Sequence, residues 1–208
     1  MKPRLSVFFT LVASLLILVA CSETPPAAEK RAEPVKPPAP VTGEYALFQM
    51  YGMARAWASD LEVLDLRSVA LTEVKSEGGK AGAWEATFVS LSKRRARSYT
   101  YSVVESSGNL HQGVFASPEQ SYTGPSGQTK PFPVSAVKID SDKAYEVALK
   151  HGADYAKKNP NVPMIFMLQW TPRHRFPAWR VIWGDSVATS NYSVFVDSSE
   201  GTYVETML

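Results

Sequence analysis

The order of hydrophobic patterns along the chain is its strongest constraint on a fold. Residues 45–60 carry apolar side chains at spacings of three and four, which is typical of an amphipathic helix. Residues 63–115 then read as four short extended segments, in several of which apolar side chains alternate with polar ones. Because neighbouring strands joined by short turns pair antiparallel, this order predicts one helix packed on an antiparallel sheet.

The same order begins again in the second half of the chain. Asp140, Ser141 and Asp142 provide capping oxygens for a helix that should end at Asn159-Pro160. The interval between the halves, residues 118–136, is rich in proline and glycine and predicts a surface linker. The fold class is therefore α+β, with two repeats of one helix and about four strands, at residues 43–117 and 137–208.

Individual strands and turns follow from alternation and turn residues. In the first half we expect strands at residues 63–74, 84–88, 99–103 and 110–115, with turns at 77–80, 93–97 and 105–109. In the second half we expect strands at residues 164–170, 179–183, 190–196 and 202–207. Strict alternation points Trp179, Val181 and Trp183 inward, and Arg180 and Ile182 outward, so that Ile182 is exposed unless something covers it.

The first residues have the pattern of an export signal. Lys2 and Arg4 precede an apolar stretch, residues 5–20, that is shorter than the roughly 20 residues a membrane-spanning helix needs. The stretch ends in Leu18-Val19-Ala20-Cys21, which resembles the lipobox of bacterial lipoproteins. The resemblance implies that a signal peptide, residues 1–20, is removed and that Cys21 is acylated, palmitate included. The alternative is a membrane helix that ends in a cysteine.

An acylated Cys21 has two consequences. It is the only cysteine, so no disulfide, thiol nucleophile or thiolate metal ligand remains. The lipid anchors the chain to a membrane of the cell envelope, and by resemblance to bacterial lipoproteins Ser22 is compatible with an outer membrane, facing the periplasm.

Residues 21–42 begin with Cys21 and then contain six prolines and almost no residue that a core could bury. A polyproline-like segment of this length reaches about 60 Å, which would hold the folded part away from the membrane. The alternative is an ordinary disordered leader whose length has no role.

Net charge argues against nucleic acid as a partner. Lys and Arg total 22 and Asp and Glu total 20, and loss of Lys2 and Arg4 with the signal peptide leaves 20 of each. A neutral chain has no global field that attracts a polyanion, so we expect no nucleic acid binding.

Part of the second half is similar to a known family. Its closing strands resemble those of PepSY and PepSY-like domains, in which a tryptophan strand leads to a V-D-x-x-x-G turn. The residues that carry this are Pro177-Ala178-Trp179-Arg180-Val181, Val194-Phe195-Val196-Asp197, Gly201 and the helix start Ile139-Asp140-Ser141-Asp142. The resemblance implies a non-catalytic envelope module that binds or restrains peptidases or other secreted proteins. It is weak over residues 45–115, although Ala83-Trp84 matches Ala178-Trp179 and supports an internal duplication.

No residue pattern indicates catalysis, a metal or a cofactor. His111, His151 and His174 show no ligand spacing, and Ser90-Leu91-Ser92-Lys93 matches S-x-x-K at a strand end, where that catalytic pair needs a helix start. We therefore expect a protein that is not an enzyme.

Two basic turns are the candidate binding sites. Lys93, Arg94, Arg95 and Arg97 form one predicted turn, and Arg173, His174 and Arg175 lie in another. Arginine binds phosphate and carboxylate with two parallel hydrogen bonds, so these turns suit envelope glycan, lipid or an acidic protein. The alternative is that they are solvated loops that keep strand edges soluble.

Two functions follow from the sequence. The first is a non-catalytic binding or inhibitory module for an envelope protein, such as a peptidase. The second is a binder of envelope glycan or lipid through Lys93 to Arg97 and Arg173 to Arg175.

Overall fold

A computed structural model describes residues 38–106, 110–125 and 129–208. The predicted signal peptide, the predicted lipidation site Cys21 and most of the predicted tether lie outside the described residues. The described residues all belong to one compact unit.

This unit consists of three short helices and a large antiparallel sheet, so the α+β class is confirmed. The helices are α1 (Gly43–Ala54), α2 (Ser141–His151) and α3 (Ala153–Lys158), with a 3₁₀ turn, η1, at Val134–Ala136. The strands are β1 (Val41–Thr42), β2 (Leu61–Val69), β3 (Lys80–Ala81), β4 (Ala83–Ser90), β5 (Arg95–Ser102), β6 (Gly113–Ala116), β7 (Gln120–Ser121), β8 (Met164–Gln169), β9 (Ala178–Trp183), β10 (Tyr192–Asp197) and β11 (Tyr203–Met207).

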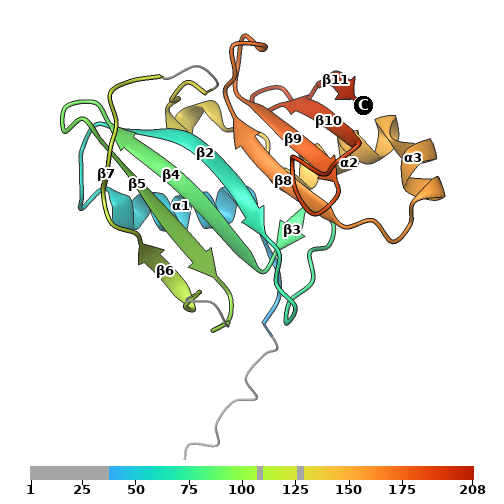
Figure 1. Ribbon diagram of the computed structural model, residues 1–208, viewed down its shortest axis with the longest axis horizontal. Helices are drawn as coiled ribbons and strands as arrows, with labels where there is room; N and C mark the ends of the chain where they lie inside the picture. Colours follow the sequence, from blue (N-terminus) through green and yellow to red (C-terminus); the bar gives the residue numbers. More distant parts are fainter. Residues whose placement is uncertain (1–37, 107–109, 126–128) are drawn as a thin grey trace, which may run out of the picture. The chain divides into compact units, whose positions relative to one another are not determined.

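Both halves of the chain contribute to the same sheet. Its strand order is β11-β10-β9-β8-β2-β4-β5-β6, with β7 added beside β5, and every neighbouring pair is antiparallel (Figure 1). The two halves meet where β2 pairs with β8, the first long strand of each. The short strands β1 and β3 pair separately.

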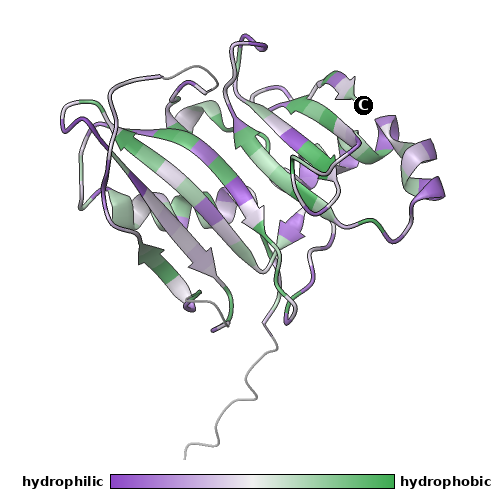
Figure 2. Ribbon diagram, in the orientation of Figure 1, coloured by the Kyte–Doolittle hydropathy of each residue, from purple (hydrophilic) through white to green (hydrophobic). Residues whose placement is uncertain are grey.

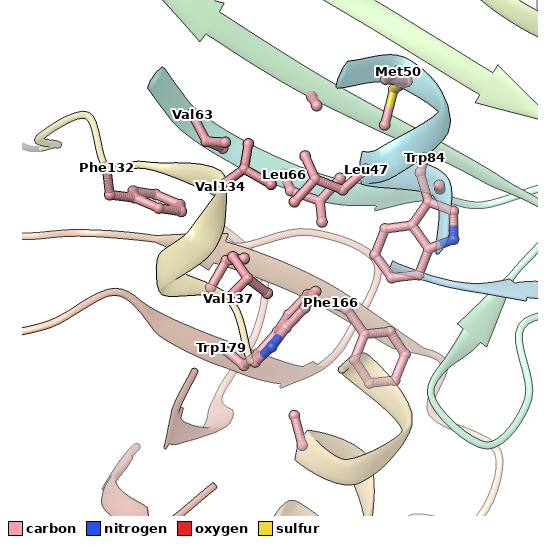
Figure 3. Packing of buried hydrophobic residues seen from close by; sticks show 14 of the residues in the cluster. Leu47, Met50, Val63, Leu66, Trp84, Phe132, Val134, Val137, Phe166 and Trp179 are labelled. Carbon is pink, nitrogen blue, oxygen red and sulfur yellow. The ribbon is translucent and has the colours of Figure 1, made fainter. Parts of the chain in front are cut away.

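All the packing of α1 and α2 is on one face of this sheet. α1 contacts β2, β4 and β5, and α2 contacts β9 and β10; in Figure 1 both helices lie behind the strands. Polar and apolar residues alternate along β2 (Figure 2), because its alternate side chains face the helices. Side chains from both halves form one buried cluster, including Trp84, Phe166 and Trp179 (Figure 3).

Trp84 and Trp179 make matching contacts in the two halves. Trp84 Nε1 donates to the carbonyl oxygen of Val41 at 3.0 Å, and Trp179 Nε1 donates to that of Ile139 at 2.7 Å. Each acceptor lies two residues before the first residue of a helix. The two indole rings meet edge to face with centroids 6.3 Å apart, so the halves share the centre of the core.

The helix starts also meet at this point. The amide of Gly43 donates to Ser141 Oγ at 2.8 Å, and the amide of Glu44 donates to Asp140 Oδ1 at 2.8 Å. α1 is thus capped by side chains from the start of α2. A Cβ on Gly43 would lie 2.6 Å from Trp179 Cη2, so any larger residue at this position would clash with the indole ring. Burial, with Asp140 and Asp142 nearby, raises the pKa of Glu44.

The prediction of a surface linker at residues 118–136 is wrong for its last part. Phe132 is completely buried and Val134 is buried. Phe132 exchanges two backbone hydrogen bonds with Val63, of 2.8 and 2.9 Å. Pro131 and Pro133 flank Phe132 and favour the extended backbone that this pairing needs, so here the prolines hold a core residue in place.

Several element boundaries also differ from the predictions. α1 ends at Ala54 and β2 ends at Val69, both earlier than expected. The second-half helix is broken at Gly152, where a Cβ would lie 3.0 Å from Trp183 Cη2. The basic turn covers residues 91–94, so Arg95 and Arg97 belong to β5 instead of the turn. The positive φ of Arg94, 55°, lies at the last residue of this turn, three residues before the predicted end of the turn at residue 97.

Candidate functional site

Among the described residues no helix covers the second face of the sheet, which we call the open face. Register places alternate side chains there, including Asp65, Arg67, Glu85, Met167, Gln169, Arg180, Ile182, Phe195, Glu205 and Met207. The outward direction of Arg180 and Ile182 is thus confirmed, although Ile182 is completely buried. Antiparallel sheets with one solvated face usually carry polar residues there, so the apolar members need an explanation.

In the first half, the open face carries an ion pair between neighbouring strands. Arg67 lies directly opposite Glu85, and Arg67 Nη2 is 2.8 Å from Glu85 Oε1. Asp65 lies two residues before Arg67 on the same face. Burial raises the pKa of Asp65 to about 6, partly opposed by Arg67 and by a hydrogen bond from Thr87.

In the second half, the corresponding position has different chemistry. Glu85 directly follows Trp84 in β4, and Arg180 directly follows Trp179 in β9. Opposite Arg180, where the first half has Arg67, stands Met167. In the part of the chain that the structure describes, Arg180 makes no ion pair with a carboxylate.

Neutral groups hold the Arg180 side chain in place. Its Nε donates to Ser193 Oγ at 3.0 Å, and its Nη2 lies 3.4 Å from Met207 Sδ. The guanidinium carbon lies 5.3 Å from the ring centroid of Phe195. Burial, together with the charge of Arg173, lowers the pKa of Arg180, so its cationic form is less favourable here than in water.

Arg180 lines a cavity of about 440 Å³ on the open face. The other lining residues come from β8, β10, β11 and the loop after β8: Gln169, Thr171, Pro172, Arg173, Phe195 and Met207. We call this the Arg180 pocket. Its volume is in the range of small-ligand sites, and its wall is mixed, with apolar and hydrogen-bonding groups.

The nearby carboxylate of Glu205 is already paired. Arg173 Nε lies 2.6 Å from Glu205 Oε1, and Arg173 Nη2 donates to Oε2 at 2.7 Å. His174 Nε2 lies 2.8 Å from Oε1, and its ring packs 4.9 Å from that of Phe195. Hydrogen bonds from Arg173 and His174 lower the pKa of Glu205. These contacts fix the loop between β8 and β9 on the open face.

A second cavity, of about 350 Å³, lies elsewhere on the same face. Its lining includes Arg67, Glu85, Ile165, Met167 and Val187, so the loop after β9 borders it. Met167, which stands opposite Arg180, belongs to its wall. The open face is therefore hollowed in two places, at the junction of the two halves beside Met167 and within the second half beside Arg180.

The first predicted basic site lies at one end of the sheet. Lys93 Nζ is 5.7 Å from the Trp57 ring, Arg95 donates to Ser121 Oγ, and Arg97 donates to the carbonyl oxygen of Ser117. Within residues 38–106, 110–125 and 129–208, Lys93, Arg94, Arg95 and Arg97 make no ion pair. The four cations are near one another in sequence, but only Lys93 and Arg94 lie in the turn.

The second predicted basic site is divided by the fold. Arg173 is engaged by Glu205 and His174 is buried, while Arg175 is exposed. Antiparallel pairing puts this loop at the same end of the sheet as the first basic turn, with β2 between their hairpins. The structure does not bring the two basic groups into one site.

The S-x-x-K match has a structural role in the hairpin. Ser90 Oγ donates to Asp60 Oδ1 at 2.6 Å and accepts from the amide of Lys93 at 3.2 Å. The amide of Ser92 donates to Asp60 Oδ2 at 2.8 Å. These hydrogen bonds, that of Ser90 first, lower the pKa of Asp60 to about 2. Ser90 therefore holds the turn between β4 and β5.

Sequence reasoning did not single out Arg180. The alternation of Trp179, Val181 and Trp183 predicts that Arg180 points outward, and this is the one indication of the site in the sequence pattern. The identity of the residue opposite Arg180 depends on strand register, which the sequence does not state.

The described residues contain neither a cluster of metal ligands nor a membrane-spanning helix. No three histidine, cysteine, aspartate or glutamate side chains there gather as metal ligands would. No helix among them has the length and hydrophobicity to span a bilayer.

Comparison with known proteins gave one structural similarity. The chain is similar to a crystal structure described as a "putative lipoprotein" from Clostridium difficile 630, with 12% sequence identity and a TM-score of 0.46. The similarity covers 82% of this chain and 93% of that chain. No protein-family model matches the sequence, and no curated protein matches it.

Proposed function

We propose that this chain is a bacterial lipoprotein, acylated at Cys21, whose folded unit binds a protein of the cell envelope without catalysing a reaction. The lipobox pattern and the proline-rich segment after it support the anchor and the tether. In this proposal the folded unit faces the periplasm from the outer membrane, and a peptidase is one class of partner.

The observation that carries the proposal is the chemistry of the open face. Ile165, Met167 and Met207 point to this face and are partly exposed, where a solvated sheet would carry polar side chains. Transient protein interfaces combine such apolar groups with hydrogen-bonding and charged ones. A hollowed, mixed surface without a helix over it fits a protein partner.

The arrangement of the two halves supports the interpretation as a tandem PepSY-like protein. In the large sheet, the four strands β2-β4-β5-β6 follow α1 and the four strands β8-β9-β10-β11 follow α2 and α3, and each set pairs in sequence order. Trp84 and Trp179 donate to carbonyl oxygens at matching positions before α1 and α2. We propose that an internal duplication produced the two halves, as the match between Ala83-Trp84 and Ala178-Trp179 suggests.

Photo-crosslinking in the source organism tests the proposed function. A photoreactive residue replaces Thr87 or Met167 on the open face, and Lys150, exposed on α2, provides the control position. We expect a discrete protein adduct from the two open-face positions and none from Lys150. No adduct from the open face, or the same adduct from all three positions, would contradict the proposal.

A second candidate function is binding of envelope glycan or lipid by the basic hairpin. The observation that favours it is that Lys93, Arg94, Arg95 and Arg97 make no ion pair within the described residues. Such binding should weaken as salt rises and should be lost when Arg94 and Arg95 are changed to glutamate. Retention on crude envelope polymer, measured at low and high salt, distinguishes it from binding at the open face.

A further inference from the structure

We infer that Arg180 is the docking point for a carboxylate, from an aspartate or glutamate side chain of a protein segment that lies across the open face. This inference rests on the proposed function and names the chemistry of the partner. It assigns Arg180 a role that neither basic turn has.

The arginines of the open face differ in whether a carboxylate pairs with them. Arg67 and Arg173 each have a carboxylate partner, Glu85 and Glu205 respectively. Arg180 is half-buried, and no carboxylate pairs with it among the described residues. A partly buried cation without a partner is unfavourable in the free protein, and an arriving carboxylate would remove that penalty.

The guanidinium of Arg180 is held in a defined orientation before any ligand binds. Ser193 accepts from Arg180 Nε, and the ring of Phe195 lies against the guanidinium, so the fork is already oriented. Of its two terminal nitrogens, Nη2 has a 3.4 Å contact with the Met207 sulfur, which is a weak acceptor. The terminal nitrogens are therefore available for the two parallel hydrogen bonds that a carboxylate accepts.

The lining of the Arg180 pocket suits a carboxylate better than a phosphate. Pro172, Phe195 and Met207 supply apolar wall around Arg180, and Gln169 and Thr171 supply hydrogen-bonding groups. An acidic side chain has an aliphatic stem for such a wall and one charge for one guanidinium. A dianionic phosphate would need a second cation, but Arg173, the other cation that lines the pocket, is already engaged by Glu205.

The test uses the full chain in detergent micelles and two short peptides as probes. One is acetyl-Leu-Glu-Leu-Gly-amide, and the other has glutamine in place of glutamate. Binding is followed by the ¹⁵Nε–¹H NMR signals of arginine side chains. We expect saturable shifts of the Arg180 signal with the glutamate peptide and at least tenfold weaker binding of the glutamine peptide.

A matched pair of variants tests the residue. Arg180→Met should reduce binding of the glutamate peptide at least tenfold while keeping the wild-type melting temperature within a few degrees. Arg55→Met removes the same charge from an exposed position after α1 and should leave binding unchanged. Equal binding of the two peptides, wild-type affinity in Arg180→Met, or a tighter response to inorganic phosphate would overturn the inference.

The outcomes separate this inference from the proposed function. If the open face crosslinks to a discrete protein in cells and Arg180→Met does not reduce that adduct, the inference fails and the proposed function stands. If the glutamate peptide binds at Arg180 but no protein crosslinks to the open face, the proposed function fails.

Discussion

The two halves of the sheet place different residues at the same position of the open face. In the first half, Arg67 and Glu85 face each other across two strands and form an ion pair. In the second half, Met167 and Arg180 occupy the corresponding places, and the guanidinium lies beside a pocket. The same pair of positions thus holds an ion pair in the first half. In the second half it holds an arginine that has no carboxylate partner among the described residues.

The first prediction concerns the core that the two halves share. Trp84→Ala and Trp179→Ala each remove a completely buried indole and its hydrogen bond to the backbone before a helix. Each variant should lower the free energy of unfolding by about 3–5 kcal/mol. Denaturant unfolding followed by tryptophan fluorescence and by circular dichroism should show one coincident transition. Separate transitions for the two halves would mean that they do not fold as one unit.

The second prediction concerns Asp65 in the first half. Its pKa is about 6 in the folded protein against an ordinary value of 3.8, because burial disfavours the charged form. Between these values the folded state binds more protons than the unfolded state, so stability falls as pH rises from about 4 to 6. Asp65→Asn should therefore raise the unfolding free energy by about 3 kcal/mol at pH 7 and by only about 0.5 kcal/mol at pH 4.

Urea denaturation of wild type and Asp65→Asn at pH 4, 5, 6 and 7 measures this difference. Asp142→Asn, on the other side of the sheet in the first turn of α2, is the control. A gain that is equal at pH 4 and pH 7 would show that the Asp65 charge is not its cause.

The third prediction compares the two arginines directly. Arg180→Met replaces a half-buried cation that has no carboxylate partner in the described chain, and should raise the unfolding free energy by about 1 kcal/mol. Arg67→Met breaks an ion pair in which the Arg67 side chain is 52% exposed, and should lower it by about 0.5 kcal/mol. Opposite signs in chemical denaturation at pH 7 support the comparison. A large loss of stability in Arg180→Met would show that Arg180 serves the fold instead of a ligand.

The fourth prediction concerns backbone strain at Arg94 in the basic hairpin. Arg94 has a φ of 55°, a conformation that glycine adopts more easily than arginine. Arg94→Gly should raise the unfolding free energy by about 0.5–1 kcal/mol, whereas Arg94→Ala should not raise it. Thermal denaturation of the two variants measures the difference. A destabilised Arg94→Gly would show that the arginine side chain contributes to the fold.

Much of the fold follows from hydrophobic periodicity. The strands at Met164–Gln169 and Ala178–Trp183 lie close to their predicted places because alternation and flanking turns define them. The Glu77–Lys80 turn also agrees, since Gly78 and Gly79 have φ values of 57° and 81°. Phe132 could not be assigned to the core from the sequence, because it lies between two prolines and its partner, Val63, is far away along the chain.

The candidate site was less predictable than the fold. Charged residues that cluster in the sequence were the obvious candidates, but the fold separates them: Arg173 pairs with Glu205, and Arg97 bonds to the backbone at Ser117. The absence of a carboxylate beside Arg180 in the described residues depends on the register of β8 against β9, and a shift of one residue would change every opposite residue.

The most direct test of the account places a carboxylate opposite Arg180. In an Arg67→Met background, which removes the other arginine opposite residue 167, Met167→Glu would pair with Arg180, and Met167→Gln in the same background is its uncharged control. The measurement is the affinity of the glutamate peptide for each variant, read from the Arg180 ¹⁵Nε signal. We predict that Met167→Glu loses binding at least tenfold while Met167→Gln retains it. Equal affinity of the two variants would contradict the claim that Arg180 binds a carboxylate from a partner.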